Sequence, residues 1–114
     1  MLNRLAPGDS IAYVQPGAYC SVRLVPAERA VPLPAVLTLE TAAATLLRGM
    51  TAEYLLHRLY PVRAGDTILV HAAAGGMGQI LSSWAKALGA TVIGTVGTPA
   101  KVALARAAGC DHVI

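Results

Sequence analysis

Residues 71–78, with the sequence HAAAGGMG, place three alanines and three glycines between an apolar run and a helical pattern. The preceding run TILV, at 67–70, is rich in aliphatic residues and predicts a buried strand. In QILSSWAKALG, at 79–89, apolar residues recur every third or fourth position, which predicts a helix that ends at Gly89. A strand, a glycine-rich turn and a helix in this order can form a dinucleotide-binding βαβ unit.

The glycines follow the GxGxxG pattern of nucleotide-binding turns, with Ala73, Gly75 and Gly78 at the three positions. In this pattern the first glycine makes the tight turn, the second lets the pyrophosphate approach the backbone, and the third lets the helix pack on the strand. The helix expected to begin near Gly76 offers unpaired N–H groups and the positive end of its dipole, which suit a pyrophosphate. The alternative is a tight turn that binds nothing.

The residues that follow the glycines predict which nucleotide is bound. NAD sites usually carry Asp or Glu about 20 residues later, where the carboxylate accepts a hydrogen bond from the ribose. This sequence has no acidic residue between Asp66 and Asp111. Gly97, Thr98 and Lys101 stand at that place instead. An ammonium and a hydroxyl beside a helix N-terminus can hold a 2′-phosphate, so we expect NADPH; the alternative for Lys101 is a solvated surface lysine.

The chain from Thr67 onward predicts alternating strands and helices. They cover 67–71, 79–88, 91–97, 98–108 and 111–114, in the order strand, helix, strand, helix, strand, with Thr98 as the cap of the second helix. Short turns between these elements indicate a parallel sheet with right-handed crossovers. The expected fold class is α/β, the first half of a Rossmann doubly wound parallel sheet.

The residues before this unit have a different sequence pattern. Residues 1–37 contain short apolar runs separated by Pro and Gly turns, which predicts a β-rich segment. Two or three strands bury too little surface to be stable alone, so this segment is expected to need partner strands or the rest of the chain.

Residues 38–62 predict two linking helices. Thr38 can cap the first helix, which is expected to stop at Gly49. Thr51 can cap the second helix, which is expected to end before Pro61.

Length and composition narrow the functional class. The chain has 114 residues, of which 55% are hydrophobic and 13% charged, and this suits a folded domain with strands covered by helices. The net charge of +3 is scattered along the chain, so no nucleic-acid partner is expected. A charge-free window from Thr67 to Ala85 contains glycine, serine and histidine and changes periodicity midway, so no membrane span is expected. With no signal peptide visible, a cytoplasmic protein is the expectation.

Cys20 and Cys110 stand alone in the sequence. Neither has the close second ligand that a zinc site or a redox CxxC motif would supply, so no metal is expected. Both cysteines are expected to be small buried residues.

Two stretches, 8–34 and 46–114, closely resemble the middle portion of the NADPH:quinone oxidoreductases. These proteins are the zeta-crystallin-like branch of the medium-chain dehydrogenase/reductase superfamily. The resemblance rests on GDSIAYVQPGAYCSVRLVPAERAVPLP and on LLRGMTAEYLLHRLYPVRAGDTILVHAAAGGMGQI with the residues that follow it. AAAGGMG is this branch's form of the glycine loop, and it is more specific than GxGxxG alone.

The resemblance implies a division of the chain and a reaction. Residues 1–37 would be the C-terminal part of a GroES-like catalytic β domain, 38–62 linking helices, and 63–114 the N-terminal half of a Rossmann NADPH-binding domain. In the family, NADPH lies between the two domains and hydride passes to a quinone without zinc. We therefore expect an NADPH-dependent quinone reductase, present as a partial chain. Two alternatives stay open: another zinc-independent enone or enoyl reductase, and a non-catalytic nucleotide-binding or interaction module.

The resemblance also implies roles for particular residues. Those expected at the pyrophosphate are Gly75, Gly76, Met77 and Gly78. Gly97 and Lys101 would contact the 2′-phosphate, beside Thr98. Thr51 and Tyr54 would face the nicotinamide, although Thr51 could be only a helix cap and Tyr54 only a half-buried aromatic residue. No catalytic residue is assigned among His57, His71 and His112, because hydride transfer to a quinone can take its protons from solvent.

Family members extend beyond both ends of this sequence. The 114 residues therefore correspond to a truncated product, to a split protein completed by another chain, or to a chain given without its flanks. A half sheet would leave an open edge, so a homo-oligomer or a complementing chain is an expected partner beside the quinone or enone substrate.

Overall fold

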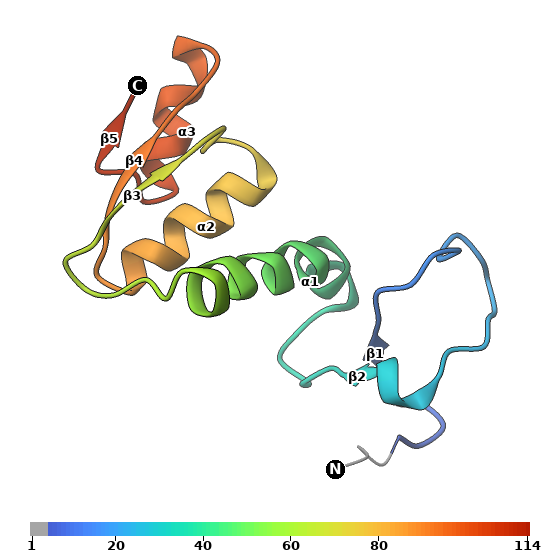
Figure 1. Cartoon of the computed structure of the whole chain (residues 1–114). Coiled ribbons are helices and arrows are strands. Elements are labelled where there is room, and N and C mark those ends of the chain that lie inside the picture. The colour runs from blue at the N-terminus through green and yellow to red at the C-terminus, as the bar shows by residue number, and fades with distance from the viewer. Residues whose placement is uncertain (1–4) are drawn as a thin grey trace. The chain divides into compact units, whose positions relative to one another are not determined.

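The computed structural model describes residues 5–114. Two compact units divide the chain, Met1–Leu47 and Arg48–Ile114, and Figure 1 shows the elements of both. The boundary lies inside helix α1 (Leu39–Glu53), so the last turns of this helix belong to the second unit.

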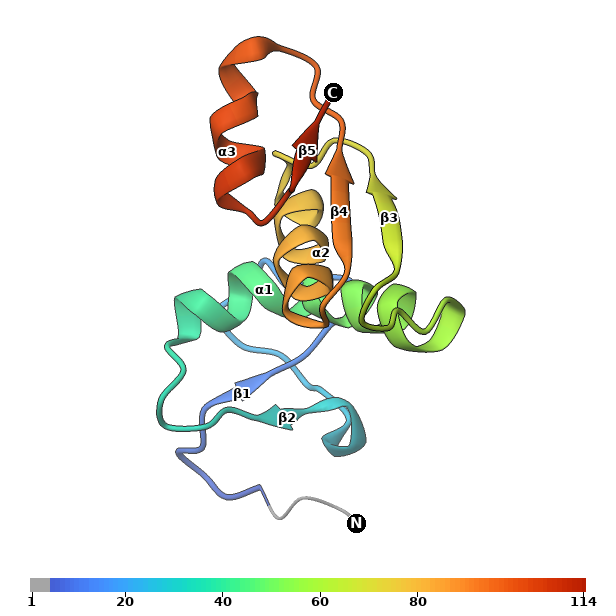
Figure 2. The ribbon, with the colours of Figure 1, turned by 90° about the vertical axis from the view of Figure 1, so that its left-hand side faces the viewer.

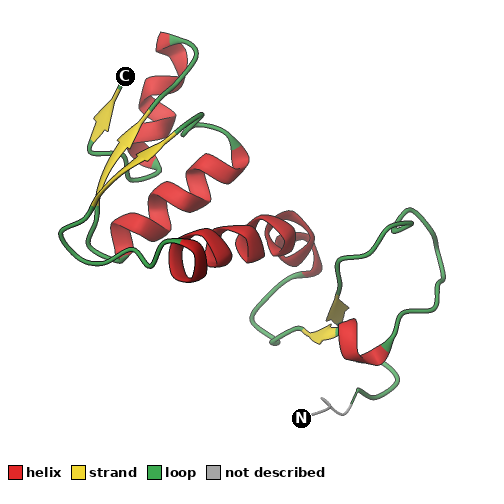
Figure 3. Cartoon of the chain, in the orientation of Figure 1, coloured by secondary structure: helices red, strands yellow, loops and turns green. Residues whose placement is uncertain are grey.

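The first unit has little regular structure. Strands β1 (Ile11–Ala12) and β2 (Val31–Pro32) pair antiparallel, with Ile11 opposite Pro32, and a short 3₁₀ turn η1 (Ala27–Arg29) precedes β2. The run PGAYCSVRLV does not form the expected strand (Figure 3), and its side chains at Tyr19, Val22 and Leu24 are exposed. A strand needs a partner to satisfy its backbone N–H and C=O groups, and no pairing of this run occurs within residues 5–114.

Helix α1 begins where the sequence predicts. The backbone N–H of Thr41 donates to Oγ1 of Thr38 over 3.1 Å, which confirms Thr38 as the cap. The expected stop at Gly49 and the expected cap at Thr51 are wrong, because α1 runs through both residues. It then continues as a π-helical segment, η2 (Tyr54–Leu59), in which the N–H of residue 60 bonds to the carbonyl of residue 55.

Packing explains why the helix does not break at Gly49. A glycine inside a helix costs about 1 kcal/mol relative to alanine. Ala52 and Leu56, in the turns that follow, are 0% and 4% exposed. Burying these side chains offsets the cost of the glycine, and the local stop signal is overridden.

The second unit contains a three-stranded parallel sheet in the order β3 (Thr67–Val70), β4 (Thr91–Gly94) and β5 (His112–Val113). Helix α2 (Gly76–Ala87) connects β3 to β4. A 3₁₀ turn η3 (Pro99–Lys101) and helix α3 (Val102–Ala107) connect β4 to β5. Figure 2 shows both helices against the same face of the sheet. The β-α-β-α-β order predicted from the sequence is confirmed.

The core of this unit is built largely from small aliphatic residues. Its buried members are Leu56, Val62, Val70, Ala73, Ala85, Ala90, Val92, Ala105 and Cys110. Trp84 and Leu88 of the predicted helix stripe pack against this cluster. Cys110 is buried as expected, whereas the same expectation for Cys20 is wrong, because Cys20 is exposed in the loop that forms no strand.

Two further properties concern only residues 5–114. No helix in this part of the chain combines the length and apolar character needed to cross a membrane. In the same residues, no three His, Cys, Asp or Glu side chains gather where they could hold a metal ion.

Candidate nucleotide-binding site

The carboxyl ends of β3 and β4 bring the glycine loop beside the loop that leads to α3. Val70 pairs with Gly94 at the end of the two strands. Beyond this pair, the N–H of Ala73 donates to the carbonyl of Thr95 over 2.9 Å. Oγ1 of Thr95 accepts the N–H of Ala72 at 3.3 Å and lies 3.2 Å from Nδ1 of His71. Thr95 therefore ties the two loops together at the edge where parallel sheets bind ligands.

The tight turn is made at Ala72 and not at Ala73. Ala72 has φ of 51°, a left-handed conformation that glycine adopts more readily than alanine. Ala73 is fully buried, and a Cβ on Gly94 would lie only 2.7 Å from its Cβ. The alanine at position 73 is thus small because it packs on β4, while the strain of the turn is held one residue earlier.

Gly78 lets helix α2 pack on the turn. A Cβ at this position would lie 2.3 Å from the carbonyl oxygen of Ala72 and 2.6 Å from Cα of Ala73. Both obstacles are backbone atoms, which cannot rotate away as a side chain can. Gly78 has the geometry expected for the third glycine of the pattern.

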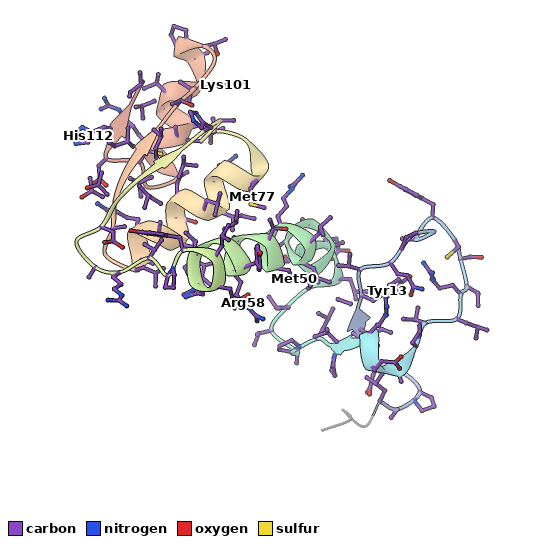
Figure 4. All side chains as sticks on the ribbon, in the orientation of Figure 1. Tyr13, Met50, Arg58, Met77, Lys101 and His112 are labelled. Carbon is purple, nitrogen blue, oxygen red and sulfur yellow. The ribbon has the colours of Figure 1, made fainter. Side chains whose placement is uncertain are left out.

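The first turn of α2 contains backbone donors that have no acceptor within the helix. Gly75 is the N-cap, and its carbonyl accepts the N–H of Gln79 over 2.9 Å. The N–H groups of residues 76–78 precede the first intrahelical bond, so the helix itself gives them no acceptor. Gly75 and Gly76 are exposed, and Met77, which is labelled in Figure 4, is half-buried. Nε2 of Gln79 donates to the carbonyl of Ala74 over 2.9 Å, which fixes the loop from its inner side.

A cation from another helix lies against this turn. If Gly76 carried a Cβ, that atom would be 2.8 Å from Cζ and from one Nη of Arg48, near the end of α1. Arg48 is exposed. The guanidinium group therefore packs on the backbone of Gly76 at the positive end of the α2 dipole.

The residues predicted to hold the 2′-phosphate follow β4. Gly97 is exposed, and a Cβ there would have no atom within 4 Å. Thr98 is the N-cap of η3 with Pro99 after it, as predicted, and its side chain makes no capping hydrogen bond. Its φ of −152° and ψ of 149° give it an extended backbone. Lys101 ends η3 and is exposed (Figure 4).

Thr51 and Tyr54 lie one turn apart on the helix that also carries Arg48. Thr51 is exposed within α1, and Tyr54, 51% exposed, is the first residue of η2. Residues three apart share one side of a helix, so the two residues predicted to face the nicotinamide point in similar directions.

The carboxylate of Asp111 is committed to a structural role. It accepts a hydrogen bond from Nζ of Lys86 and another, over 2.9 Å, from the N–H of Val92. The Lys86 hydrogen bond and then the Val92 N–H lower the pKa of Asp111 below its ordinary value. The acid is therefore held ionised between α2 and the sheet, and it balances Lys86.

The described residues fit a dinucleotide. The cradle that a Cβ on Gly78 would fill, the unpaired donors at the start of α2 and the guanidinium of Arg48 suit a pyrophosphate. The open space at Gly97 and the nearby Lys101 suit a further phosphate. Sequence reasoning missed Arg48, Thr95 and Gln79; only Thr95 had a signal, because it follows the strand next to β3.

The proteins to which this sequence is similar include quinone oxidoreductases, a 2-haloacrylate reductase and reducing polyketide synthases. No protein-family model matches the sequence. Quinone oxidoreductase 1 of Escherichia coli is 46% identical over 115 residues, which cover 99% of this chain and 35% of that protein. A 2-haloacrylate reductase of Burkholderia is 53% identical over 100 residues, covering 86% of this chain and 30% of the relative.

Solved structures agree with these relatives. The crystal structure of E. coli quinone oxidoreductase complexed with NADPH superposes with a TM-score of 0.91 at 46% identity, over 96% of this chain and 34% of that one. The chain thus spans about a third of the length of the proteins it matches. It is homologous to the quinone oxidoreductases of the medium-chain dehydrogenase/reductase superfamily and has the fold of the corresponding third of those proteins.

Proposed function

We propose that this chain is the NADPH-binding part of an NADPH-dependent quinone reductase. One observation carries the proposal: the unpaired N–H groups of residues 76–78 lie beside the Arg48 guanidinium on a glycine turn. The absence of acidic residues between Asp66 and Asp111 supports the same choice, because no carboxylate from this segment repels a phosphate. The homologous E. coli enzyme whose structure contains NADPH adds support.

Each predicted residue keeps a role in this proposal. The pyrophosphate lies on Gly75, Gly76, Met77 and Gly78. The 2′-phosphate lies near Gly97, Thr98 and Lys101. Thr51 and Tyr54 belong to the nicotinamide side of the cofactor.

The proposal also covers the division of the chain and its surroundings. Residues 1–37 belong to a GroES-like catalytic β domain, 38–62 to the linking segment, and 63–114 to the N-terminal half of the Rossmann domain. The reaction is proposed to be zinc-independent. A cytoplasmic location and assembly with further copies or with a complementing chain remain predictions from the sequence.

The residues of this chain bind and orient the cofactor. The bound dihydronicotinamide supplies a hydride, and the quinone takes this hydride with a proton from solvent to become a hydroquinone. The fixed N–H groups at the start of α2 and the charges of Arg48 and Lys101 hold the phosphates, so one end of the cofactor is immobilised before reaction.

An activated alkene is the second candidate acceptor. The 53% identity with a 2-haloacrylate reductase favours it, because that protein is named for reduction of an alkene conjugated to a carboxylate. The two candidates share the nucleotide site and differ at the acceptor. NADPH oxidation measured with a simple quinone and with a 2-haloacrylate separates them, and oxidation with neither favours the non-catalytic alternative.

The binding proposal is tested with Trp84, the single tryptophan, which lies on α2. The purified 114-residue chain is titrated with NADPH and with NADH, and Trp84 emission and energy transfer to the nicotinamide are recorded. Circular dichroism checks that the chain is folded. We expect saturable binding that is at least about tenfold tighter for NADPH, because a charge-assisted contact to the extra phosphate adds affinity. A folded chain that binds neither nucleotide would contradict the proposal.

A further inference from the structure

Arg48 reaches the glycine loop from α1, and the sequence pattern gave Arg48 itself no role in nucleotide binding. Its guanidinium carbon lies 2.8 Å from the place of a Cβ on Gly76, so the group rests on the first turn of α2. Arg48 and the glycine loop belong to the same compact unit, Arg48–Ile114. The contact is therefore internal to that unit.

Among residues 5–114, no ion pair neutralises the charge of Arg48. In residues 5–114 the ion pairs join Arg58 to Glu53 and Lys86 to Asp111, and neither includes Arg48. The N-terminus of α2 carries a partial positive charge, which disfavours a cation by about 0.3–1 kcal/mol. A guanidinium in this place is favourable when an anion lies between it and the backbone donors.

We propose that Arg48 is a cofactor-binding residue that neutralises the pyrophosphate over Gly76, and that it acts equally on NADPH and NADH. This inference rests on the proposed function. Both nucleotides carry the pyrophosphate, whereas only NADPH carries the 2′-phosphate assigned to Lys101. Arg48 therefore sets the affinity for the dinucleotide, and Lys101 sets the choice between the two forms.

Gly76 makes the position of Arg48 possible. Any larger residue at 76 would push the guanidinium aside, because its atoms would come within 2.8 Å of the new Cβ. The obstacle is the flexible end of a side chain, so the fold itself can tolerate the change. Gly76, the second glycine of the GG pair, thus leaves room for the guanidinium of Arg48 as well as for a phosphate.

The test compares Arg48→Gln with Lys101→Gln and with Arg63→Gln. Arg63 is an exposed arginine that precedes the amino end of β3, whereas the glycine loop follows the carboxyl end of this strand. Removal of its charge is therefore the matched control. Dissociation constants for NADPH and NADH are measured by Trp84 emission at two salt concentrations. For Arg48→Gln we expect both affinities to fall about tenfold or more with their ratio unchanged, and with a weaker salt dependence. Lys101→Gln changes the ratio, and Arg63→Gln changes neither value.

Two outcomes would overturn the role of Arg48. One is an Arg48→Gln chain that binds both nucleotides as tightly as the original. The other is a change in the ratio, which would place Arg48 at the 2′-phosphate. If the original chain is folded and binds no nucleotide, the proposed function fails instead, so the two failures are distinguishable.

A double-mutant cycle with Gly76→Ala tests the contact itself. Gly76→Ala displaces the guanidinium, so its effect on NADPH affinity should be smaller in an Arg48→Gln background than in the original chain. Fully additive effects would show that Arg48 does not act from its place over Gly76. Circular dichroism of all four chains confirms that they are folded.

Discussion

The carbonyl oxygen of Ala72 occupies the space that a side chain at residue 78 would need, 2.3 Å from the place of its Cβ. Ala72 holds this carbonyl in position through its left-handed backbone, with φ of 51°. The conformation of the turn and the packing of the first helical residues after it therefore depend on each other. The consequence is that the glycine loop tolerates alanine at some of its glycines and not at others.

Gly78→Ala is expected to destabilise the chain. The new Cβ would collide with backbone atoms of Ala72 and Ala73, and overpacking of this kind costs about 1–3 kcal/mol. Thermal unfolding followed by circular dichroism measures the loss, and NADPH affinity should fall with it. Gly49→Ala is the matched control: Gly49 lies inside α1 with no atom within 4 Å of a Cβ, so alanine there should stabilise by up to about 1 kcal/mol. Equal melting of the Gly78→Ala and original chains would refute the steric role.

Gly97→Ala separates folding from binding. A Cβ at this position meets no atom within 4 Å, so the free energy of unfolding should change by less than about 0.5 kcal/mol. If the open space is used by the adenosine 2′-phosphate, NADPH affinity should nevertheless fall by about threefold or more, whereas NADH affinity changes less. Titration and thermal melts of the same preparation give both values. Unchanged NADPH affinity would remove Gly97 from the site.

Lys101→Glu is expected to abolish the preference for NADPH. The new carboxylate repels the 2′-phosphate, so NADPH affinity should fall at least about tenfold while NADH affinity is kept or improves. Arg106→Gln is the control, because Arg106 is an exposed cation near the end of α3. The ratio of the two dissociation constants is the measurement. A ratio that stays unchanged in Lys101→Glu would make Lys101 an ordinary surface lysine.

Asp111 should make the stability of the chain depend on acid pH. Its pKa is lowered in the folded state by the Lys86 hydrogen bond and the Val92 N–H, so the unfolded chain binds the proton more readily. The stabilisation is present above the ordinary carboxyl pKa and is lost as the pH falls through the lower, folded-state value. Asp111→Asn removes this dependence.

Urea unfolding at pH 7 and at about pH 3 checks the prediction for Asp111, since carboxyl groups titrate near pH 4. The Asp111→Asn chain should be less stable than the original at pH 7, and the difference should shrink at the lower pH. Glu40→Gln, at an exposed residue in the first turn of α1, controls for the loss of a carboxylate in general. A difference that stays constant between the two pH values would contradict the assigned cause.

The elements of the nucleotide site were predictable because their signals are local. The run TILV, the glycines after it and the helical stripe through Trp84 lie within a few residues of one another, and their order decides a βαβ unit. The acid-free stretch likewise pointed to NADPH without any structure. The sequence also indicated the family, and homologues at 46–53% identity confirm that resemblance.

The errors arose where packing competes with a local signal. Glycine is typical of a helix end and threonine of a helix start, which led to the wrong predictions at Gly49 and Thr51. Burial of Ala52 and Leu56 keeps one helix intact instead. PGAYCSVRLV has the composition of a strand, but a strand also depends on a partner that composition does not reveal. The left-handed residue is Ala72, because hydrogen bonds to Thr95, just after the neighbouring strand, fix the turn.

By itself, the sequence determined the glycine turn and the alternation of strands and helices, and it predicted a phosphate-bearing nucleotide, since each depends on neighbours along the chain. Only the tertiary structure placed Arg48 over Gly76 and Thr95 under the turn. These contacts join residues from different elements, and the register of β3 with β4 and the packing of side chains decide them. The spacing of residues along the chain does not predict these contacts, because they depend on how the elements pack in the folded unit.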